Sequence, residues 1–522
     1  MAFDPASWAE SLGRLQSWRR WAVAFVSGVL AAAALPPTGL VFLLVPAFCI
    51  LLWLIGTKNI RAAAVVGWWF GLGFFAASFY WVASAFLVEA ERYGWLAPFA
   101  VFGLAAVMAV YTALATALTQ LISQRMRLND WARTLTLAGV WTFTEWLRGE
   151  LLTGFPWNLI GNIWVVSDPM LQSAAWVGVF GLGLVTVAAA SLPAVLASGT
   201  SRRQWAMALS GIIVLALMAG GGVVRLNSAK IADIDGVRLR LVQPNIPQHL
   251  KWRPNKRLDH VRRQLTMSRQ PPSDGKPPTH VIWAETAVPY NLFADRQLQK
   301  SIGTVAPKDG LVITGAPRGE REPGTGQKLW NSAHAISPAG NIVATYDKKH
   351  LVPFGEYVPM RSVLKFSKLT AGRLDFSSGT GPRVLDLSGL PPVAMLICYE
   401  VIFPDEILGE DQNTPRPGWL LNITNDAWFG VTTGPHQHLA AARLRAVEHG
   451  LPLVRVANTG ISAIIDPYGR TNVALALGKA GVLDGNLPKA LDPTIFSRFG
   501  ALITWFLIFV TIALPVTIGR EN

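Results

Sequence analysis

The sequence predicts a polytopic α-helical membrane bundle of about eight transmembrane helices joined to an α/β domain. Three observations lead to this fold class. Only 15% of the 522 residues are charged, whereas roughly 25% is usual for a soluble protein. Apolar residues are concentrated before residue 225 and after residue 496. Between these regions, short apolar runs alternate with polar turns rich in Gly and Pro, as in a soluble domain of strands and helices.

Residues 1–225 are predicted to form a transmembrane domain of about seven helices, and residues 496–522 a last transmembrane helix with a short tail. One crossing needs about 20 apolar residues. The apolar segments lie at about 21–35, 39–56, 62–88, 95–123, 133–147, 170–198, 204–224 and 499–518. The first two are short and are separated by Pro36-Pro37, so they could form a single hairpin.

The distribution of Lys and Arg between these segments predicts their orientation. Arg14, Arg19 and Arg20 flank the first crossing, and further basic residues follow the second, fourth and sixth: Lys58, Arg61, Arg125, Arg127, Arg133, Arg202 and Arg203. By the positive-inside rule the N-terminus is cytoplasmic. Seven crossings then place the domain at 226–495 outside the cytoplasm. This orientation requires segment 133–147 to span, and that segment is weak because Glu145, Arg148 and Glu150 crowd its end.

Charge and cysteine content exclude several classes of function. The net charge is +14, but no basic helix, zinc finger or RNA-binding motif accompanies it, so we expect a basic surface that faces anionic phospholipid and no nucleic-acid partner. The two cysteines are Cys49, inside an apolar segment, and Cys398, in the soluble domain. A disulfide between them is not expected, and a Cys-type zinc site is excluded.

Residues 226–495 are predicted to form an α/β domain because strands and helices alternate along them. Expected strands are 237–242, 280–283, 311–314, 331–337, 342–346, 393–398, 419–423, 453–457 and 461–465. Expected helices are about 254–269, 293–305, 404–410 and 436–450. The polar segments 318–328 and 361–390 are expected to be loops.

Three of these strands end in residues that could carry out chemistry. Glu285 follows strand 280–283, Lys348 and Lys349 follow strand 342–346, and Cys398 ends strand 393–398. A nucleophilic thiol needs a base and a positive group to hold the oxyanion. If the strands are neighbours in one sheet, these groups converge at one edge. Adjacent strand residues point to opposite faces, so only one lysine can face the thiol, and residue chemistry leaves open which.

The alternatives for these residues are structural. A free Cys is often a small buried hydrophobe, and a lone Glu is most often a surface or capping carboxylate. The segments around them decide between these interpretations. Residues 346–359 read Tyr-Asp-Lys-Lys-His-Leu-Val-Pro-Phe-Gly-Glu-Tyr-Val-Pro, and residues 398–400 read Cys-Tyr-Glu. Here the chain resembles the nitrilase (carbon–nitrogen hydrolase) superfamily and, with its membrane segments, the apolipoprotein N-acyltransferase family.

The resemblance implies an α-β-β-α sandwich and a role for each matching residue. Glu285 would be the general base, Lys348 would stabilise the tetrahedral oxyanion, and Cys398 would carry the acyl group as a thioester. Supporting roles in catalysis or substrate binding would fall to Glu356, Tyr399, Glu400 and Trp252. It implies no cofactor and no metal.

The implied activity is N-acylation of the N-terminal S-diacylglyceryl-cysteine of apolipoproteins, with a phospholipid as acyl donor and a ping-pong mechanism. The expected partners are therefore the phospholipid, the apolipoprotein N-terminus and the bilayer, and the protein is expected to be a monomer. The resemblance also implies a multi-pass protein of the bacterial inner membrane with its catalytic domain on the periplasmic side.

Rival interpretations remain open at this point. A membrane-tethered amidohydrolase would pass the acyl group to water, and a transporter or scaffold would not need the thiol. His436 and His438 with Asp426 are a weak metal pattern. A Cys–His pair with His350 or His449 would leave Glu285 and the lysines unexplained. Residues 425–430 are interpreted as a mobile flap with apolar side chains, or as an ordinary turn.

Overall fold

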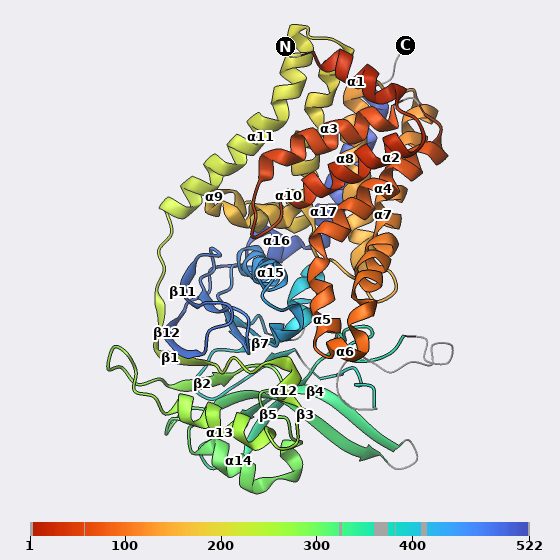
Figure 1. Cartoon of the computed structure of the whole chain (residues 1–522). Coiled ribbons are helices and arrows are strands. Elements are labelled where there is room, and N and C mark those ends of the chain that lie inside the picture. Colours follow the sequence, from red (N-terminus) through yellow and green to blue (C-terminus); the bar gives the residue numbers. More distant parts are fainter. Residues whose placement is uncertain are drawn as a thin grey trace. The chain divides into compact units, whose positions relative to one another are not determined.

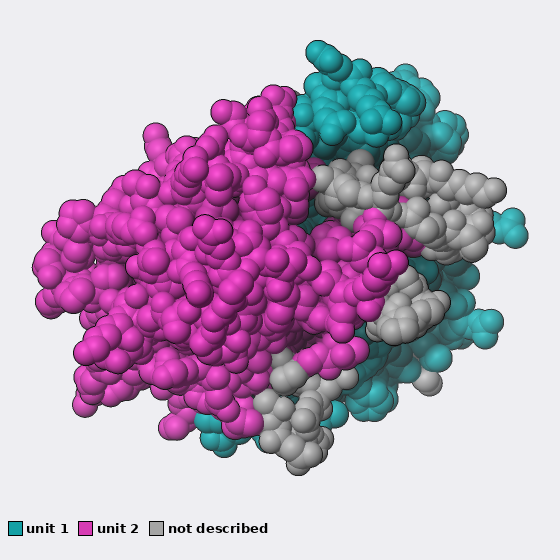
Figure 2. Space-filling model, turned by 90° about the horizontal axis from the view of Figure 1, so that it is seen from below, with its two compact units in different colours: residues 1–229, 493–522 teal, residues 230–492 magenta. Residues whose placement is uncertain are grey.

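The chain forms two compact units in the computed structural model, which describes residues 4–56, 58–322, 326–359, 374–381, 383–408 and 415–519. The first unit joins Met1–Ala229 to Pro493–Asn522, and the second comprises Lys230–Asp492. Figure 2 distinguishes the two units by colour. The second unit is thus a continuous insertion between two parts of the first.

The first unit is helical (Figure 1). Its helices are α1 (Pro5–Arg14), α2 (Ser17–Ala32), α3 (Leu44–Ile55), α4 (Ile60–Ser78), α5 (Ala83–Leu87), α6 (Ala90–Tyr93), α7 (Ala97–Met126), α8 (Asp130–Glu150), α9 (Asp168–Leu171), α10 (Ala174–Ser191), α11 (Arg202–Asn227), α16 (Ile495–Phe499) and α17 (Ala501–Ile518). Polar caps start three of the long helices: Asn59 before α4, Asn129 before α8, and Ser201 before α11. Such residues satisfy the free N–H groups of a first turn.

Close helix packing in this unit depends on small residues. A Cβ atom on Gly28 of α2 would lie 1.9 Å from the Phe70 carbonyl oxygen of α4, and one on Gly73 of α4 would lie 2.0 Å from the Phe25 carbonyl oxygen of α2. Glycine at both positions therefore lets the two backbones approach, as is common between membrane helices.

Five helical stretches in the described residues are long and apolar enough to cross a membrane: Ile60–Ser78, Ala90–Met126, Ala174–Ser198, Arg202–Asn227 and Ala501–Ile518. α2 and α3, on either side of Pro36-Pro37, are shorter at 16 and 12 residues. The weak segment 133–147 lies inside the 21-residue α8. The count of eight crossings and the orientation stay predictions.

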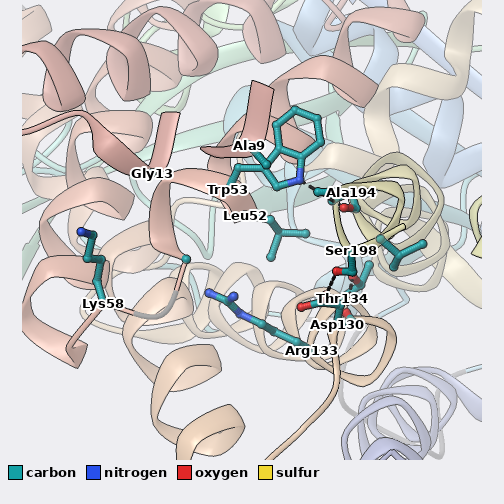
Figure 3. A pocket seen from close by; sticks show the side chains of 13 residues that line it. Ala9, Gly13, Leu52, Trp53, Lys58, Asp130, Arg133, Thr134, Ala194 and Ser198 are labelled. Carbon is teal, nitrogen blue, oxygen red and sulfur yellow. Dashed lines mark hydrogen bonds between the residues drawn. The ribbon is translucent and has the colours of Figure 1, made fainter. Parts of the chain in front are cut away.

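The first unit also contains a cavity of about 320 Å³ (Figure 3). Its lining combines apolar side chains such as Leu52 and Trp53 with Lys58, Asp130 and Arg133. The indole of Trp53 donates to the Ala194 carbonyl oxygen at 3.1 Å, and Ser198 donates to Asp130. These bonds join α3 and α8 to the 3-10 turn Leu192–Ser198.

The second unit contains two six-stranded sheets. The first has the order β12-β1-β2-β3-β4-β5 and the second β11-β10-β9-β8-β7-β6. The first is built from β1 (Asp233–Gln243), β2 (His280–Trp283), β3 (Val312–Glu322), β4 (Gly326–Ile336), β5 (Ile342–Asp347) and β12 (Gly481–Pro488). The second is built from β6 (Val384–Leu385), β7 (Val393–Ile397), β8 (Trp419–Thr424), β9 (Leu453–Ala457), β10 (Ser462–Ile465) and β11 (Thr471–Leu475).

The two sheets pack against each other, with β9 touching β1 and β2, and helices cover their outer faces (Figure 1). Buried residues of α13 (Arg257–Ser268) and α14 (Arg296–Gly303) share a core with β2 and β3, including Val261, Ile302, Trp283 and Val312. α15 (Gly434–His449) packs on β9 of the other sheet. This is the α-β-β-α sandwich that the resemblance implied.

Each of the nine expected strands lies within an observed strand or extends beyond it by one residue at one end, but one expected loop is wrong. Within segment 318–328, the described residues continue β3 and β4 as a long hairpin, with pairing out to Glu322 and Gly326. Arg318 stabilises it, because its guanidinium stacks 3.8 Å from the Trp330 ring and bonds Asp347 at 2.7 Å. β6, β11 and β12 were not expected.

The expected helices need smaller corrections. Helix 254–269 begins at Arg257, and helix 293–305 is shortened to Arg296–Gly303. Helix 404–410 is a 3-10 turn at Pro404–Glu406, and residues 409 and 410 lie outside the described residues. In the expected loop 361–390, residues 361–373 and 382 also lie outside them, and Val384–Leu385 forms β6.

Candidate active site

The three predicted chemical groups meet, but not from neighbouring strands of one sheet. Glu285 follows β2, and Lys348 follows β5, which is separated from β2 by β3 and β4. Cys398 follows β7 of the other sheet. The strands are therefore not neighbours in one sheet, which was the condition for convergence at a single edge. Convergence depends on the face-to-face packing of the two sheets, which no local pattern in the sequence encodes.

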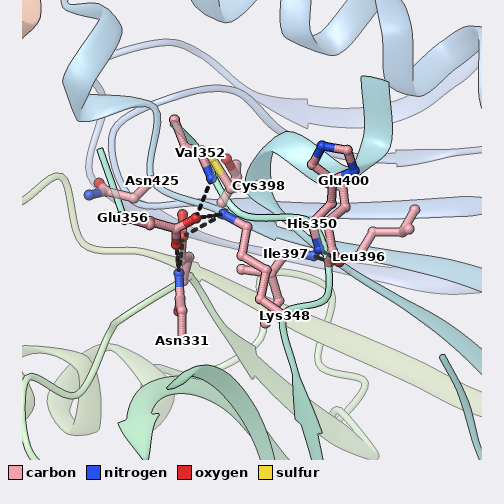
Figure 4. A network of polar contacts seen from close by, with 12 residues as sticks. Asn331, Lys348, His350, Val352, Glu356, Leu396, Ile397, Cys398, Glu400 and Asn425 are labelled. Atoms are coloured by element: carbon pink, nitrogen blue, oxygen red, sulfur yellow. Dashed lines mark hydrogen bonds and ion pairs between the residues drawn. The ribbon is translucent and has the colours of Figure 1, made fainter. Parts of the chain in front are cut away.

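Lys348 lies at the centre of a buried polar cluster. Its Nζ atom is 2.8 Å from Glu356 Oε2 and 4.0 Å from Glu285 Oε1. Asn331 on β4 donates from Nδ2 to Glu285 Oε1 and to Glu356 Oε1, at 2.7 Å each. Figure 4 shows Lys348 and Asn331 converging on the Glu356 carboxylate. Only 1% of Lys348 is exposed, whereas the Lys349 side chain is exposed. The structure thus selects Lys348 as the lysine that faces the site.

The segment that bears Glu285 is packed closely against a neighbouring strand. Gly315 on β3 packs against the residues that follow β2: a Cβ atom there would lie 2.7 Å from Glu285 Cα and 2.4 Å from the Thr286 backbone nitrogen. Thr286 itself has a φ of +44°. The chain therefore turns sharply just after Glu285, and Gly315 leaves room for that turn.

Cys398 occupies a sharp turn between β7 and the 3-10 turn Cys398–Ile402. Its φ is +53°, a left-handed conformation that costs energy for a non-glycine residue. Glu400 holds this turn, because its Oε2 accepts from the Ile397 backbone N–H at 2.7 Å. The other oxygen, Oε1, accepts from the Tyr346 hydroxyl at 2.7 Å and from the Lys349 backbone N–H at 3.0 Å. Glu400 therefore fixes the thiol-bearing turn to the segment that bears Lys348.

The Cys398 carbonyl is fixed by a second buried network. His438 Nε2 lies 3.1 Å from the Cys398 oxygen, and Asn422 donates to the same oxygen at 3.3 Å. Asp426 then contacts His438 Nδ1 at 3.0 Å and Arg455 at 2.7 Å. Burial alone would raise the pKa of Asp426, but Arg455 and His438 hold it well below its usual range.

Electrostatics couple the thiol to this cluster. Burial and the Glu285 carboxylate raise the pKa of the Cys398 thiol, against a smaller opposing effect of Lys348. Burial raises the pKa of Glu285, and Lys348 partly offsets it. Burial would lower the pKa of Lys348, but Glu356 and Glu285 outweigh it, so the pKa is raised. The resting site therefore holds a protonated thiol beside a carboxyl group that binds protons readily and a firmly protonated lysine.

The remaining predicted site residues lie around this centre. Tyr399 is buried, with its ring centroid 5.0 Å from that of Phe403. Trp252 is partly buried, and the Arg257 guanidinium lies 5.9 Å from its ring. Their substrate contacts stay predictions.

The structure also gives the surroundings of the residues in the alternative metal and Cys–His patterns. The described residues contain no group of three His, Cys, Asp or Glu side chains able to hold a metal. His350 bonds Glu406 at 2.9 Å and stacks on Phe403. Asn425, at the start of the predicted flap 425–430, is anchored by bonds to Gln248 and Asn458.

Three residues of the site were not anticipated: Asn331, His438 as a contact of the Cys398 carbonyl, and Lys251. Lys251, in the short helix α12 (Gln248–Lys251), donates from Nζ to the Glu285 carbonyl oxygen at 3.0 Å. None of these three residues lies in a charged motif at the end of a strand, as Glu285 and Lys348 do. Lys251 immediately precedes Trp252, which was the signal available in the sequence.

Comparison with known proteins covers almost the whole chain. A family model described as apolipoprotein N-acyltransferase N-terminal domain matches residues 27–192, and one described as carbon–nitrogen hydrolase matches residues 281–493. A Rhodopseudomonas palustris protein named apolipoprotein N-acyltransferase is 42% identical, covering 93% of this chain and 92% of that protein. A protein of the same name from Bradyrhizobium diazoefficiens is 40% identical, covering 96% and 95%. Among solved structures, an amidase of the nitrilase superfamily from Nesterenkonia aligns with 50% of this chain and 94% of its own at 16% identity, with a TM-score of 0.34.

Proposed function

Because this chain belongs to the apolipoprotein N-acyltransferase family and is an acyltransferase, we propose that it moves an acyl chain from a phospholipid to the N-terminal diacylglyceryl-cysteine of apolipoproteins. The observation that carries the proposal is the buried cluster in which Glu285 and Lys348 interact with the Cys398 thiol. A base, a cation and a nucleophile are the groups that acyl transfer through a thioester requires.

In the first half-reaction, Cys398 Sγ attacks the ester carbonyl carbon of the phospholipid while its proton passes to Glu285. The carbonyl oxygen becomes an oxyanion, whose charge Lys348 stabilises. The intermediate then collapses: the bond from the carbonyl carbon to the glycerol oxygen breaks, and this oxygen takes the proton from Glu285. The products are lysophospholipid and a thioester on Cys398.

In the second half-reaction, the neutral α-amine of the diacylglyceryl-cysteine attacks the thioester carbonyl. Glu285 accepts a proton from the attacking nitrogen, the C–S bond breaks, and Cys398 recovers its proton. An amide is formed and the enzyme is regenerated. Glu356 and Asn331 support both steps, because they hold Lys348 and Glu285 in place.

The helical unit gives this chemistry its location. Both substrates are lipid-anchored, so a soluble acyltransferase would have to extract each from the bilayer. The long apolar helices of the first unit support a membrane protein, and we assign the catalytic unit to the periplasmic side of the bacterial inner membrane, acting as a monomer. Phospholipid would enter from the outer leaflet.

The test uses the purified full-length protein and a phospholipid with a labelled acyl chain. We expect hydroxylamine-sensitive label on the wild type and none on Cys398→Ala. Cys49→Ala is the matched control, because Cys49 is the other cysteine of the chain and lies buried in the helical unit. Absence of label on the wild type, or label that persists in Cys398→Ala, would overturn the mechanism.

A second stage separates transfer from hydrolysis. When a diacylglyceryl-cysteine peptide is added to labelled enzyme, the label should move to the peptide in an alkali-stable amide. Release of free fatty acid at the same rate with and without peptide would instead identify an amidohydrolase that passes the acyl group to water.

A further inference from the structure

Lys251 is a buried lysine next to the catalytic base. Only 3% of the residue is exposed, although lysine is almost never buried without a partner. Its Nζ atom donates to the backbone oxygen of Glu285 at 3.0 Å. That oxygen precedes Thr286, whose φ of +44° marks the sharp turn after β2. One hydrogen bond thus ties α12 to the backbone that presents the base.

The charges around the site leave a role for a second cation. Lys348 faces two carboxylates and is 2.8 Å from Glu356, but 4.0 Å from Glu285. Glu285 is therefore the less fully compensated carboxylate. The ionisable groups that act on Glu285 are Lys348, Glu356 and Lys251. With two carboxylates and two lysines, the cluster is neutral while the thiol keeps its proton.

The acidity of Lys251 fits this position. Burial lowers its pKa to about 8, and attraction to Glu285 and to Cys398 offsets only part of that effect. The side chain is therefore cationic at neutral pH and loses its charge in mildly alkaline solution. Lys348 behaves oppositely, because its pKa is raised.

We propose that Lys251 is a positioning residue of the active site, whose ammonium group holds the Glu285 backbone, keeps Glu285 ionised and favours the Cys398 thiolate as it forms. This inference rests on the proposed acyl-enzyme mechanism. Proton transfer from the thiol to Glu285 moves one negative charge from the carboxylate to sulfur, and Lys251 interacts with both groups. The cation therefore remains compensated throughout the step and does not itself exchange a proton.

The pH dependence follows from these charges. When pH falls, Glu285 becomes protonated and cannot accept the thiol proton, so thioester formation slows. When pH rises through about 8, Lys251 loses its charge, and the negative charge on Glu285 or Cys398 becomes less favourable. Besides Lys251, the charged groups that act on the thiol are Glu285, Lys348 and Asp426, and Lys348 and Asp426 keep their charge over this range. The rate of acylation should therefore pass through a maximum, and its decrease at alkaline pH should follow the deprotonation of Lys251.

The experiment measures the initial rate of hydroxylamine-sensitive labelling between pH 5.5 and 9.5 for the full-length enzyme and three variants. Lys251→Met removes the charge and keeps the chain length, Lys251→Arg keeps the charge, and Lys300→Met removes an exposed lysine from α14. We expect Lys251→Met to be about tenfold slower at pH 6, because a nearby cation shifts a carboxyl pKa by one or more units. In the pH–rate profile of this variant, the rise on the acid side (the acid limb) should move to higher pH. The decrease of the rate on the alkaline side should disappear.

The other variants and outcomes separate this role from a packing role. Lys251→Arg should keep the acid limb of the wild type and lose the fall near pH 8, and Lys300→Met should match the wild type throughout. A Lys251→Met rate reduced by the same factor at every pH would overturn the proposal, because that result indicates packing alone. Unlabelled wild type would instead refute the proposed function.

A second measurement works without turnover. Alkylation of Cys398 by iodoacetamide, followed by mass spectrometry of its peptide, reports the thiolate fraction. We expect it to be several-fold slower at pH 7 in Lys251→Met than in Lys251→Arg. Equal rates in the two variants would contradict the electrostatic role, even if Lys251→Met were too poorly folded to be labelled by phospholipid.

Discussion

The ammonium group of Lys348 lies 2.8 Å from the carboxylate of Glu356, and both side chains are almost completely buried. Removing one partner of a buried ion pair is costly because the other is left without compensation. In the proposed mechanism, Glu356 therefore holds Lys348 in the orientation that meets the oxyanion.

Glu356→Gln should slow thioester formation and destabilise the second unit by about 3 kcal/mol, because it removes the charge that compensates Lys348. Labelling kinetics and thermal unfolding measure the two effects. Glu320→Gln is the matched control: Glu320 pairs with Arg318 at the same 2.8 Å but is 59% exposed, and such pairs contribute about 0–1 kcal/mol. Equal losses in the two variants would contradict the buried-pair interpretation.

Lys348→Met and Lys349→Met should differ strongly although the residues are adjacent. Lys348→Met removes the cation that meets the oxyanion in the proposed mechanism, and loss of such a group typically costs about 10²–10³-fold in rate. Lys349→Met should stay close to the wild-type rate, because its side chain is exposed and its contact with Glu400 is made by the backbone N–H. Initial labelling rates at pH 7 check this, and a larger loss in Lys349→Met would reverse the assignment.

Asn331→Asp should shift the acid limb of activity to higher pH. The amide nitrogen donates to Glu285 and Glu356, and a carboxylate in its place would repel both. Burial already raises the pKa of Glu285, and the added charge raises it further. The base is then protonated at a pH where the wild type is still active. A pH–rate profile of labelling would show the shift; an unmoved acid limb with a lower plateau would refute it.

His438→Ala should slow thioester formation by up to about 10²-fold through misplacement of the nucleophile. The substitution removes one of two contacts to the Cys398 carbonyl and leaves Asp426 paired with Arg455. His436→Ala, two residues earlier on α15 and partly exposed, is the control. Labelling rates and thermal unfolding of both variants separate the local effect from loss of the fold, and a His438→Ala enzyme with wild-type rates would show that Asn422 alone suffices.

Several of the strands that the sequence predicts correctly are buried apolar runs, such as 393–397 and 419–424, where every residue is buried. Strand β11 could not be predicted in this way, because most of its side chains are exposed or only partly buried. β12 contains Gly481, Asp484 and Asn486, and its partner β1 lies more than 200 residues away in the sequence. Such strands are formed by long-range pairing and not by a local pattern.

The same distinction applies to the site. Cys398 and Lys348 stand in extended motifs, so their types and order could be predicted. Asn331 does not lie in a recognisable sequence motif. It reaches Glu285 and Glu356 because of its position on β4 beside β5. Lys251 has no such motif either, since burial of a lysine cannot be inferred from its own residue type. Contacts between separate segments therefore had to come from the structure.

The antiparallel pairing of β1 with β12 joins the first strand of the second unit to its last. The chain thus enters and leaves this unit at one sheet edge, so a long segment can be inserted into a helical chain without separating the helices on either side. It also sets an order of assembly during synthesis. The outer edge of β1 stays unpaired until residues 481–488 have been made, and unpaired strand edges favour pairing with other chains. A nascent chain halted before β12 should therefore be an aggregation-prone and chaperone-dependent species.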